Sequence, residues 1–170
     1  MFHRAEARIT KQELNFFLIH DSFFLILLAK HDMLARMAWV IVGLGNPGEK
    51  YDSTRHNAGR MAVEYFAKTR KLNGWREDKK SKSLAAAGLI GKTAVAVVLP
   101  ETFMNKSGVS VAKFVKSAKA AERLVVVYDD LDLPLGKFKL SCDRGRGGHK
   151  GLESVMRTFK TGQLTRVRSG

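Results

Sequence analysis

Residues 39–59 constrain the fold more than any other part of the chain. They begin with a continuous apolar run, Trp39 to Val42, of the kind that forms a strand buried on both faces. A glycine-rich turn containing Asn46 follows, and a polar loop then carries His56. The apolar spacing beyond this loop predicts a helix over residues 59–71. The pattern places an asparagine at the end of a strand and a histidine before a helix, at the edge where open α/β sheets bind ligands.

The glycine-rich turn also has the spacing of a dinucleotide-binding fingerprint, with glycines at 43, 45 and 48. Such a site needs a helix that begins at once, so that its N-terminus faces a pyrophosphate. Here Pro47 and a polar loop intervene, and residues 67–70, where an acidic side chain is expected, contain none. We therefore do not expect a dinucleotide cofactor.

The rest of the chain alternates strand and helix patterns. A basic link over residues 73–83 precedes two strands joined by a turn at Gly91-Lys92. The predicted strands are 84–90, 93–99, 124–128, 138–140 and one beginning near 166, and the predicted helices after the first are 108–121 and 152–159. The second helix would bury Val109, Val111, Ala112 and Val115. Such alternation predicts an α/β fold, with parallel strands in one sheet and helices on both of its faces.

Residues 1–38 differ in character from the rest of the chain. Their two apolar runs, 16–19 and 23–28, are separated by His20-Asp21-Ser22, so neither approaches the roughly 20 residues of a membrane-spanning helix. Acidic residues are spread through the segment, which argues against a mitochondrial presequence. We expect residues 1–38 to be an N-terminal extension that need not belong to the folded domain, and residues 39–170 to form the domain.

The chain carries 30 basic and 16 acidic residues, a formal net charge of +14. Residues 1–38 contribute five basic and four acidic side chains, so nearly all of this charge lies in the predicted domain. Such an excess favours an anionic partner, nucleic acid above all, although a soluble basic protein is an equally simple interpretation. Cys142 is the only cysteine, which excludes a disulfide framework and suits a reducing compartment.

Polar side chains converge at the predicted ligand edge of the sheet. Asn46, Asn105 and Asp129 follow three different strands, and His56 lies in the loop between two of them. A histidine with a carboxylate partner can activate water as a general base, while amides can stabilise the oxyanion of acyl transfer. Because no serine or cysteine lies in a nucleophile elbow, direct attack by water is the simpler scheme.

Asp129, Asp130 and Asp132 also suggest a magnesium site, because clustered carboxylates suit that ion. Alternate residues at a strand end point to opposite faces, however, so Asp130 does not easily share a site with its neighbours. We therefore expect no metal.

Four sequence blocks in this order resemble the bacterial-type peptidyl-tRNA hydrolase family. They are GLGNPGEKYDSTRHNAG at 43–59, FMNKSG at 103–108, YDDLDLPLGK at 128–137 and GGHKGL at 147–152. The resemblance implies a mixed, largely parallel central sheet with helices on both faces. It also implies a cytoplasmic enzyme without metal or cofactor, which cleaves the ester between peptide and tRNA and so recycles tRNA in translation and ribosome rescue. We expect a monomer without membrane association.

The resemblance also implies roles for individual residues. His56 matches the catalytic base and Asp129 the carboxylate that orients it. Asn46 and Asn105 match amides that position the peptide and the water, and Tyr51 matches an aromatic residue near the tRNA 3′ end. Two further expected substrate contacts are His149 and Lys150, and the expected contacts to tRNA phosphates are Lys137, Lys139, Arg144, Arg146, Arg166 and Arg168.

Some positions depart from the family pattern. Lys150 replaces an asparagine that binds substrate, and Ser141-Cys142 replaces a basic pair. The family continues beyond the Arg166-x-Arg168 motif with a final strand and helices, so we expect the domain to be incomplete at its C-terminus. These departures leave an alternative open: a catalytically impaired relative that binds tRNA or other RNA through its basic face.

Overall fold

The computed structural model describes residues 39–72, 74–142 and 148–170. The predictions for residues 1–38, Arg144 and Arg146 lie outside these ranges. The strands are β1 (Trp39–Gly43), β2 (Arg76–Asp78), β3 (Ser83–Ile90), β4 (Thr93–Pro100), β5 (Leu124–Asp129), β6 (Phe138–Ser141) and β7 (Thr165–Ser169). The helices are α3 (Ala58–Thr69), α4 (Ser107–Val111) and α5 (Lys150–Phe159), with 3-10 turns η2 (Glu49–Tyr51), η3 (Arg55–Asn57), η4 (Met104–Lys106) and η5 (Ala120–Arg123).

The strands form one seven-stranded sheet in the order β2-β3-β4-β1-β5-β7-β6. The four central strands, β4, β1, β5 and β7, are parallel to one another, and the pairings toward both edges are antiparallel. The mixed α/β sheet is therefore confirmed, with its parallel part confined to the centre. Because β1 and β5 are neighbours, the segments that follow their carboxyl ends start from the same edge of the sheet.

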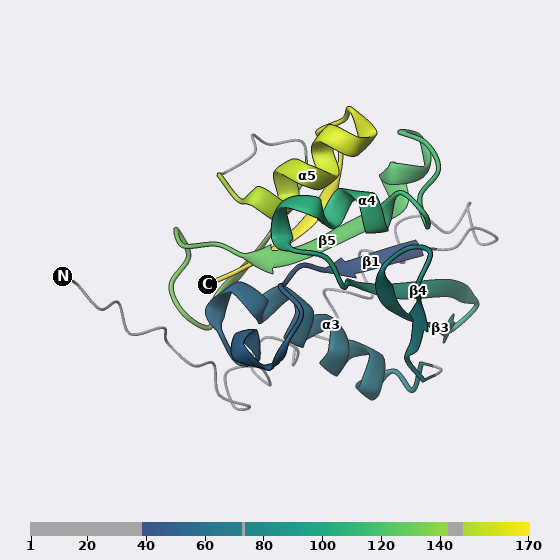
Figure 1. The fold of residues 1–170 in the computed structure, drawn as a ribbon, viewed down its shortest axis with the longest axis horizontal. Coiled ribbons are helices and arrows are strands. Elements are labelled where there is room, and N and C mark those ends of the chain that lie inside the picture. The colour runs from purple at the N-terminus through teal and green to yellow at the C-terminus, as the bar shows by residue number, and fades with distance from the viewer. Residues whose placement is uncertain (1–38, 73, 143–147) are drawn as a thin grey trace.

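Helices cover both faces of the sheet, as predicted (Figure 1). One face packs against α3, and the other packs against α4 and α5. The alternation along β1 explains how one strand serves both layers: Val40 and Val42 join the α4–α5 side, while Trp39 and Ile41 join the α3 side. A strand that is apolar at every position therefore lies between two cores.

Helix α3 confirms the predicted helix to within two residues at each end. It buries Ala62, Val63, Phe66 and Ala67 against the sheet, an i, i+1, i+4, i+5 stripe of an amphipathic helix. Its first turn approaches β5 closely, because a Cβ at Gly59 would overlap the Val127 carbonyl group. This close contact fixes the position of the segment that precedes the helix.

The helix predicted over residues 108–121 is wrong in length, since α4 spans only Ser107–Val111. The Ser117 hydroxyl accepts a hydrogen bond from the Ala120 N–H at 3.1 Å, and such local side-chain bonds compete with helical ones. Val109, predicted to lie on the apolar face, is 59% exposed, whereas Val111 and Val115 are buried as expected. Within the predicted basic link, β2 forms from mostly exposed polar residues that show no strand pattern.

Within the described ranges, none of the helices has the length and apolar character needed to cross a membrane.

Candidate active site

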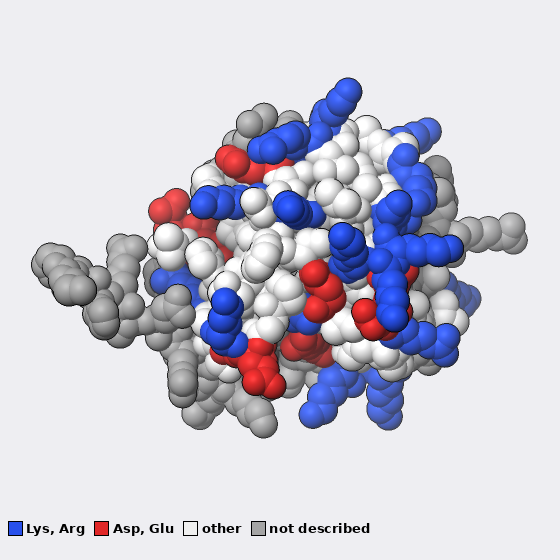
Figure 2. Space-filling model, in the orientation of Figure 1, with Lys and Arg blue, Asp and Glu red and all other residues white. Residues whose placement is uncertain are grey.

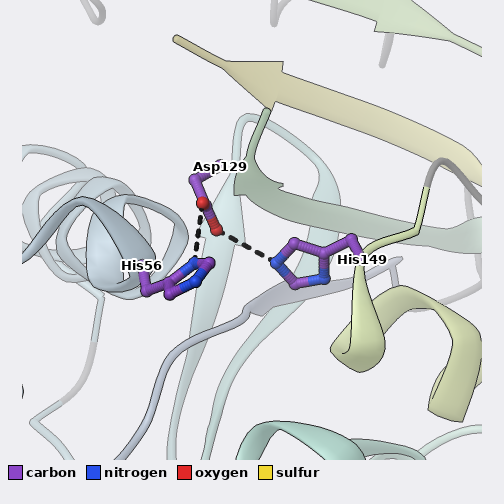
Figure 3. A group of neighbouring side chains, drawn as sticks. All are labelled: His56, Asp129 and His149. Atoms are coloured by element: carbon purple, nitrogen blue, oxygen red, sulfur yellow. Dashed lines mark hydrogen bonds and ion pairs between the residues drawn. The ribbon is translucent and has the colours of Figure 1, made fainter. Parts of the chain in front are cut away.

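Three side chains from separate segments meet at the carboxyl edge of the sheet (Figure 3). Asp129 is the last residue of β5, His56 lies in η3, and His149 is the residue before α5. One oxygen of the Asp129 carboxylate, Oδ2, is 2.8 Å from Nδ1 of His56. The other, Oδ1, is 3.0 Å from Nε2 of His149. The carboxylate is therefore held by one histidine on each oxygen.

Hydrogen bonding determines which nitrogen of His149 carries a proton. Its Nδ1 accepts the backbone N–H of Leu152 at 3.2 Å, which caps the N-terminus of α5. An accepting nitrogen has no proton, so in the neutral ring the proton is on Nε2 and is donated to Asp129. His149 thereby acts as a neutral donor that links the start of α5 to the carboxylate.

The Asp129 carboxyl is the buried centre of this arrangement, with 2% of its side chain exposed. Burial raises the pKa of Asp129, but the hydrogen bonds and charges of His149 and His56 outweigh burial, and the net pKa lies below the usual value. Asp129 is thus an anion near neutral pH, and both nitrogens that face it act as donors.

His56 differs from its two partners because 64% of its side chain is exposed. Its Nδ1–H donates to Asp129, so the lone pair of the neutral ring is on Nε2. That nitrogen lies on the side of the ring away from the carboxylate and can take a proton from water. The arrangement is that of a general base whose tautomer and orientation are fixed by a buried anion.

A cavity of about 420 Å³ opens beside these three residues. Its other lining includes Tyr128, Ser141 and Arg168. The Arg168 guanidinium donates to Oδ2 of Asp130 at 2.7 Å, so this cation is paired at the cavity wall. The hollow gives a substrate access to the exposed edge of His56.

The same three residues could in principle ligate a metal, since His56, Asp129 and His149 offer atoms within 4.8 Å of one another. Binding a metal through Nε2 of His149 would require its proton to move to Nδ1, where it would face the Leu152 N–H. The hydrogen bonds therefore favour a proton-transfer site over a metal site. Asp130 is bonded to Arg168 instead.

The predicted amides lie on two segments that a hydrogen bond joins. Oδ1 of Asn46 accepts the backbone N–H of Met104 at 2.9 Å, which joins the turn after β1 to η4. Asn105, the next residue of η4, is exposed. Tyr51 is half-buried in η2, and the Lys50 ammonium lies 4.9 Å from its ring centre. The cavity lining named above does not include these three predicted residues.

The predicted basic contacts divide into accessible and buried side chains. Lys137, Lys139 and Lys150 are exposed and can meet an anionic partner. Arg166 is only 1% exposed, and its guanidinium donates to the Gly162 carbonyl at 2.9 Å. This burial argues against the tRNA-phosphate contact predicted for Arg166, although Arg166 also lines the cavity beside the site.

Sequence reasoning misses two features of the site. It predicts that His149 contacts substrate but not that it bonds Asp129, although its place directly before a predicted helix is a usable signal. It also does not single out Asn57, which is 1% exposed and whose amide bonds the backbone of Asn46. The shape of the site therefore depends on buried polar residues around the histidine.

The lowered pKa of Asp129 predicts a pH-dependent contribution to folding stability. An unfolded aspartate titrates near pH ~3.9, and the folded-state pKa lies lower. Asp129 therefore stabilises the fold above the unfolded pKa, and this contribution is lost as the pH falls through the folded pKa. Denaturant unfolding should show wild type more stable than Asp129→Asn at neutral pH, with the difference shrinking below about pH 4. A difference that is constant with pH would contradict this assignment.

Fold and site together define a class: an α/β protein with a hydrogen-bonded histidine–carboxylate pair at the carboxyl edge of parallel strands. Comparison with known proteins makes the class specific. The peptidyl-tRNA hydrolase family model matches residues 40–170. The chain is 43% identical to peptidyl-tRNA hydrolase of Carboxydothermus hydrogenoformans over 133 residues, 78% of this chain and 70% of that protein. The chain belongs to the peptidyl-tRNA hydrolase family.

Other relatives support the same assignment. The chloroplastic peptidyl-tRNA hydrolase of Arabidopsis thaliana is 42% identical over 74% of this chain and 43% of its own length. The crystal structure of peptidyl-tRNA hydrolase from Acinetobacter baumannii superposes with a TM-score of 0.72 at 36% identity, over 77% of this chain. That match spans 66% of the Acinetobacter chain, so this chain covers about two thirds of the solved fold.

Proposed function

We propose that this chain hydrolyses the ester bond between peptide and tRNA in peptidyl-tRNA, and so recycles tRNA in translation. The observation that carries the proposal is the His56–Asp129 pair, in which a buried anion orients an exposed histidine. Ester hydrolysis needs a base that deprotonates water next to the carbonyl carbon, and His56 presents its Nε2 for that purpose.

The reaction proceeds through two proton transfers. Nε2 of His56 takes a proton from water as the water oxygen attacks the ester carbonyl, and a tetrahedral oxyanion forms. When the oxyanion collapses, the bond to the ribose oxygen breaks and the imidazolium returns its proton to the leaving hydroxyl. Asp129 stabilises the imidazolium between these steps and stays ionised, since its pKa lies below the usual range.

Binding of tRNA is supported by the charge of the chain. Basic side chains outnumber acidic ones on the face shown in Figure 2, and many gather at the end where β3 and β4 lie. Lys137, Lys139 and Lys150 are exposed basic residues nearer in sequence to the active-site loops. We propose that these side chains contact tRNA phosphates, and that the protein acts as a monomer in the cytoplasm. Each contact would add to the dependence of affinity on salt.

The alternative function is RNA binding without catalysis. Lys150 and Ser141 stand where the family pattern has an asparagine and a basic residue, which favours this alternative. The hydrogen-bonded set of His56, Asp129 and His149 favours catalysis, because RNA binding alone does not require an oriented general base.

Release of peptide from an N-blocked aminoacyl-tRNA tests the proposal directly. We expect multiple turnovers without added metal, and binding of the same tRNA should be measured in parallel. Cleavage by the chain would support the enzyme. If the chain binds the tRNA in a salt-dependent way but releases no peptide above the uncatalysed rate, the RNA-binding alternative is favoured.

A further inference from the structure

Asn57 holds the backbone of Asn46 from both sides. Its Oδ1 accepts the Asn46 N–H at 2.8 Å, and its Nδ2 donates to the Asn46 carbonyl at 3.0 Å. β1 ends at Gly43 and the Leu44 N–H still bonds the Val127 carbonyl of β5, so at Asn46 a side-chain amide takes the place of a partner strand. Since Asn57 is 1% exposed, both bonds are shielded from competing water.

The side chain of Asn46 is fixed by a different contact. Its Oδ1 accepts the backbone N–H of Met104 at 2.9 Å. Among the described residues the Nδ2 donor pair of Asn46 has no hydrogen-bond partner, so these two N–H groups remain to meet a ligand. Asn46 is therefore presented as a hydrogen-bond donor, suited to an oxygen acceptor such as a carbonyl or an oxyanion.

We call the two Asn57–Asn46 hydrogen bonds the clamp. The residue at position 45 must be small for the clamp to form. A Cβ at Gly45 would lie 2.8 Å from Oδ1 of Asn57, so a side chain at position 45 would displace the amide. Asn57 also directly follows His56, and both belong to η3. The same turn therefore carries the general base on one residue and the clamp on the next.

We propose that Asn57 is a positioning residue for the ester hydrolysis proposed above. It fixes the backbone of Asn46 so that Nδ2 of Asn46 donates to a carbonyl oxygen of the peptidyl part of the substrate. This contact holds the substrate in position relative to His56. The inference rests on the proposed function for its reaction, and on the two Asn57–Asn46 hydrogen bonds for its geometry.

A double-mutant cycle tests the proposal on the whole chain. Asn57→Ala should lower kcat/KM about 10-fold or more, because misplacing a substrate-positioning group has costs of this order. In an Asn46→Ala background, the further change Asn57→Ala should lower kcat/KM by less than about 3-fold, since residues that act as a unit are not additive. Losses that multiply, or an Asn57→Ala variant with unchanged kcat/KM, would overturn the proposal.

Asn57→Asp separates positioning from loss of fold. It is isosteric and keeps the acceptor for the Asn46 N–H, but it sets an oxygen against the Asn46 carbonyl in place of the Nδ2 donor. We expect Asn57→Asp to lower kcat/KM about as much as Asn57→Ala does. Its affinity for tRNA should stay within about 2-fold of wild type. A wild-type kcat/KM for Asn57→Asp would show that the two-sided clamp is not needed.

A binding measurement keeps the inference testable if the wild type does not cleave. The probe is an adenosine whose 3′-amino group carries a short N-blocked peptide through an amide. Asn57→Ala should weaken its binding, and the effect should vanish in the Asn46→Ala background. Probe binding with this coupling but no esterase activity would refute the proposed function and keep the clamp. Independent effects of the two substitutions would refute the clamp.

Discussion

Replacing His56 by alanine is expected to lower kcat for peptidyl-tRNA hydrolysis by about 10²- to 10⁴-fold, the usual contribution of general acid–base catalysis. The variant loses the only group of the hydrogen-bonded triad that is open to solvent, because Asp129 and His149 are largely buried. Water at the ester carbonyl would then have no base to take its proton. Single-turnover release of peptide from an N-blocked aminoacyl-tRNA measures the effect on the chemical step.

The rest of the molecule should be almost unchanged in this variant. Since 64% of the His56 side chain is exposed, its removal leaves no core cavity, and tRNA binding should stay close to wild type. Lys139→Ala is a matched surface control: it removes an exposed charge, so it should weaken tRNA binding and reduce its salt dependence without changing kcat. A His56→Ala variant that keeps the wild-type kcat would show that another group activates the water.

The centre of this site could be predicted because its signals are local and strong. Fully apolar runs at β1 and β5 identify buried parallel strands, and residues that follow such strands share one edge of the sheet. Asp129 and His56 are 73 positions apart, yet the sheet-edge rule is enough to bring them together. Strand periodicity and sheet topology are thus enough to predict that the proposed catalytic pair, His56 and Asp129, lies together.

The other features depend on tertiary contacts that leave little trace in local sequence. The sequence pattern suggests that Arg166 is a surface cation, but its side chain on β7 is buried. There its guanidinium donates a hydrogen bond to the Gly162 carbonyl. Val109 fits a helical apolar stripe, but α4 buries its other four residues, Ser107, Gly108, Ser110 and Val111, and leaves Val109 exposed. Asn57 looks like a loop residue, and only the packing of η3 against the β1 turn shows that it is a buried clamp.

The largest stability loss is expected at Gly59, in the first turn of α3. An added Cβ would overlap the Val127 carbonyl and would also lie 2.9 Å from the Leu44 carbonyl oxygen. Both neighbours are backbone atoms, and the Val127 oxygen already accepts the Leu44 N–H at 2.9 Å. Relief of the overlap would require α3 to move away from β5. We therefore expect Gly59→Ala to reduce the free energy of unfolding by about 3 kcal/mol or more.

A loss of this size would lower Tm by about 10 °C for a domain of this size, which a thermal melt followed by circular dichroism can measure. The matched control is Gly74→Ala, where an added Cβ meets nothing within 4 Å, and Tm should change by less than about 2 °C. Because His56 lies just before α3, the shift should also lower kcat/KM at temperatures where the variant is still folded. A Gly59→Ala variant with wild-type Tm and activity would show that α3 and β5 can separate without cost, contrary to the close packing that positions the catalytic turn.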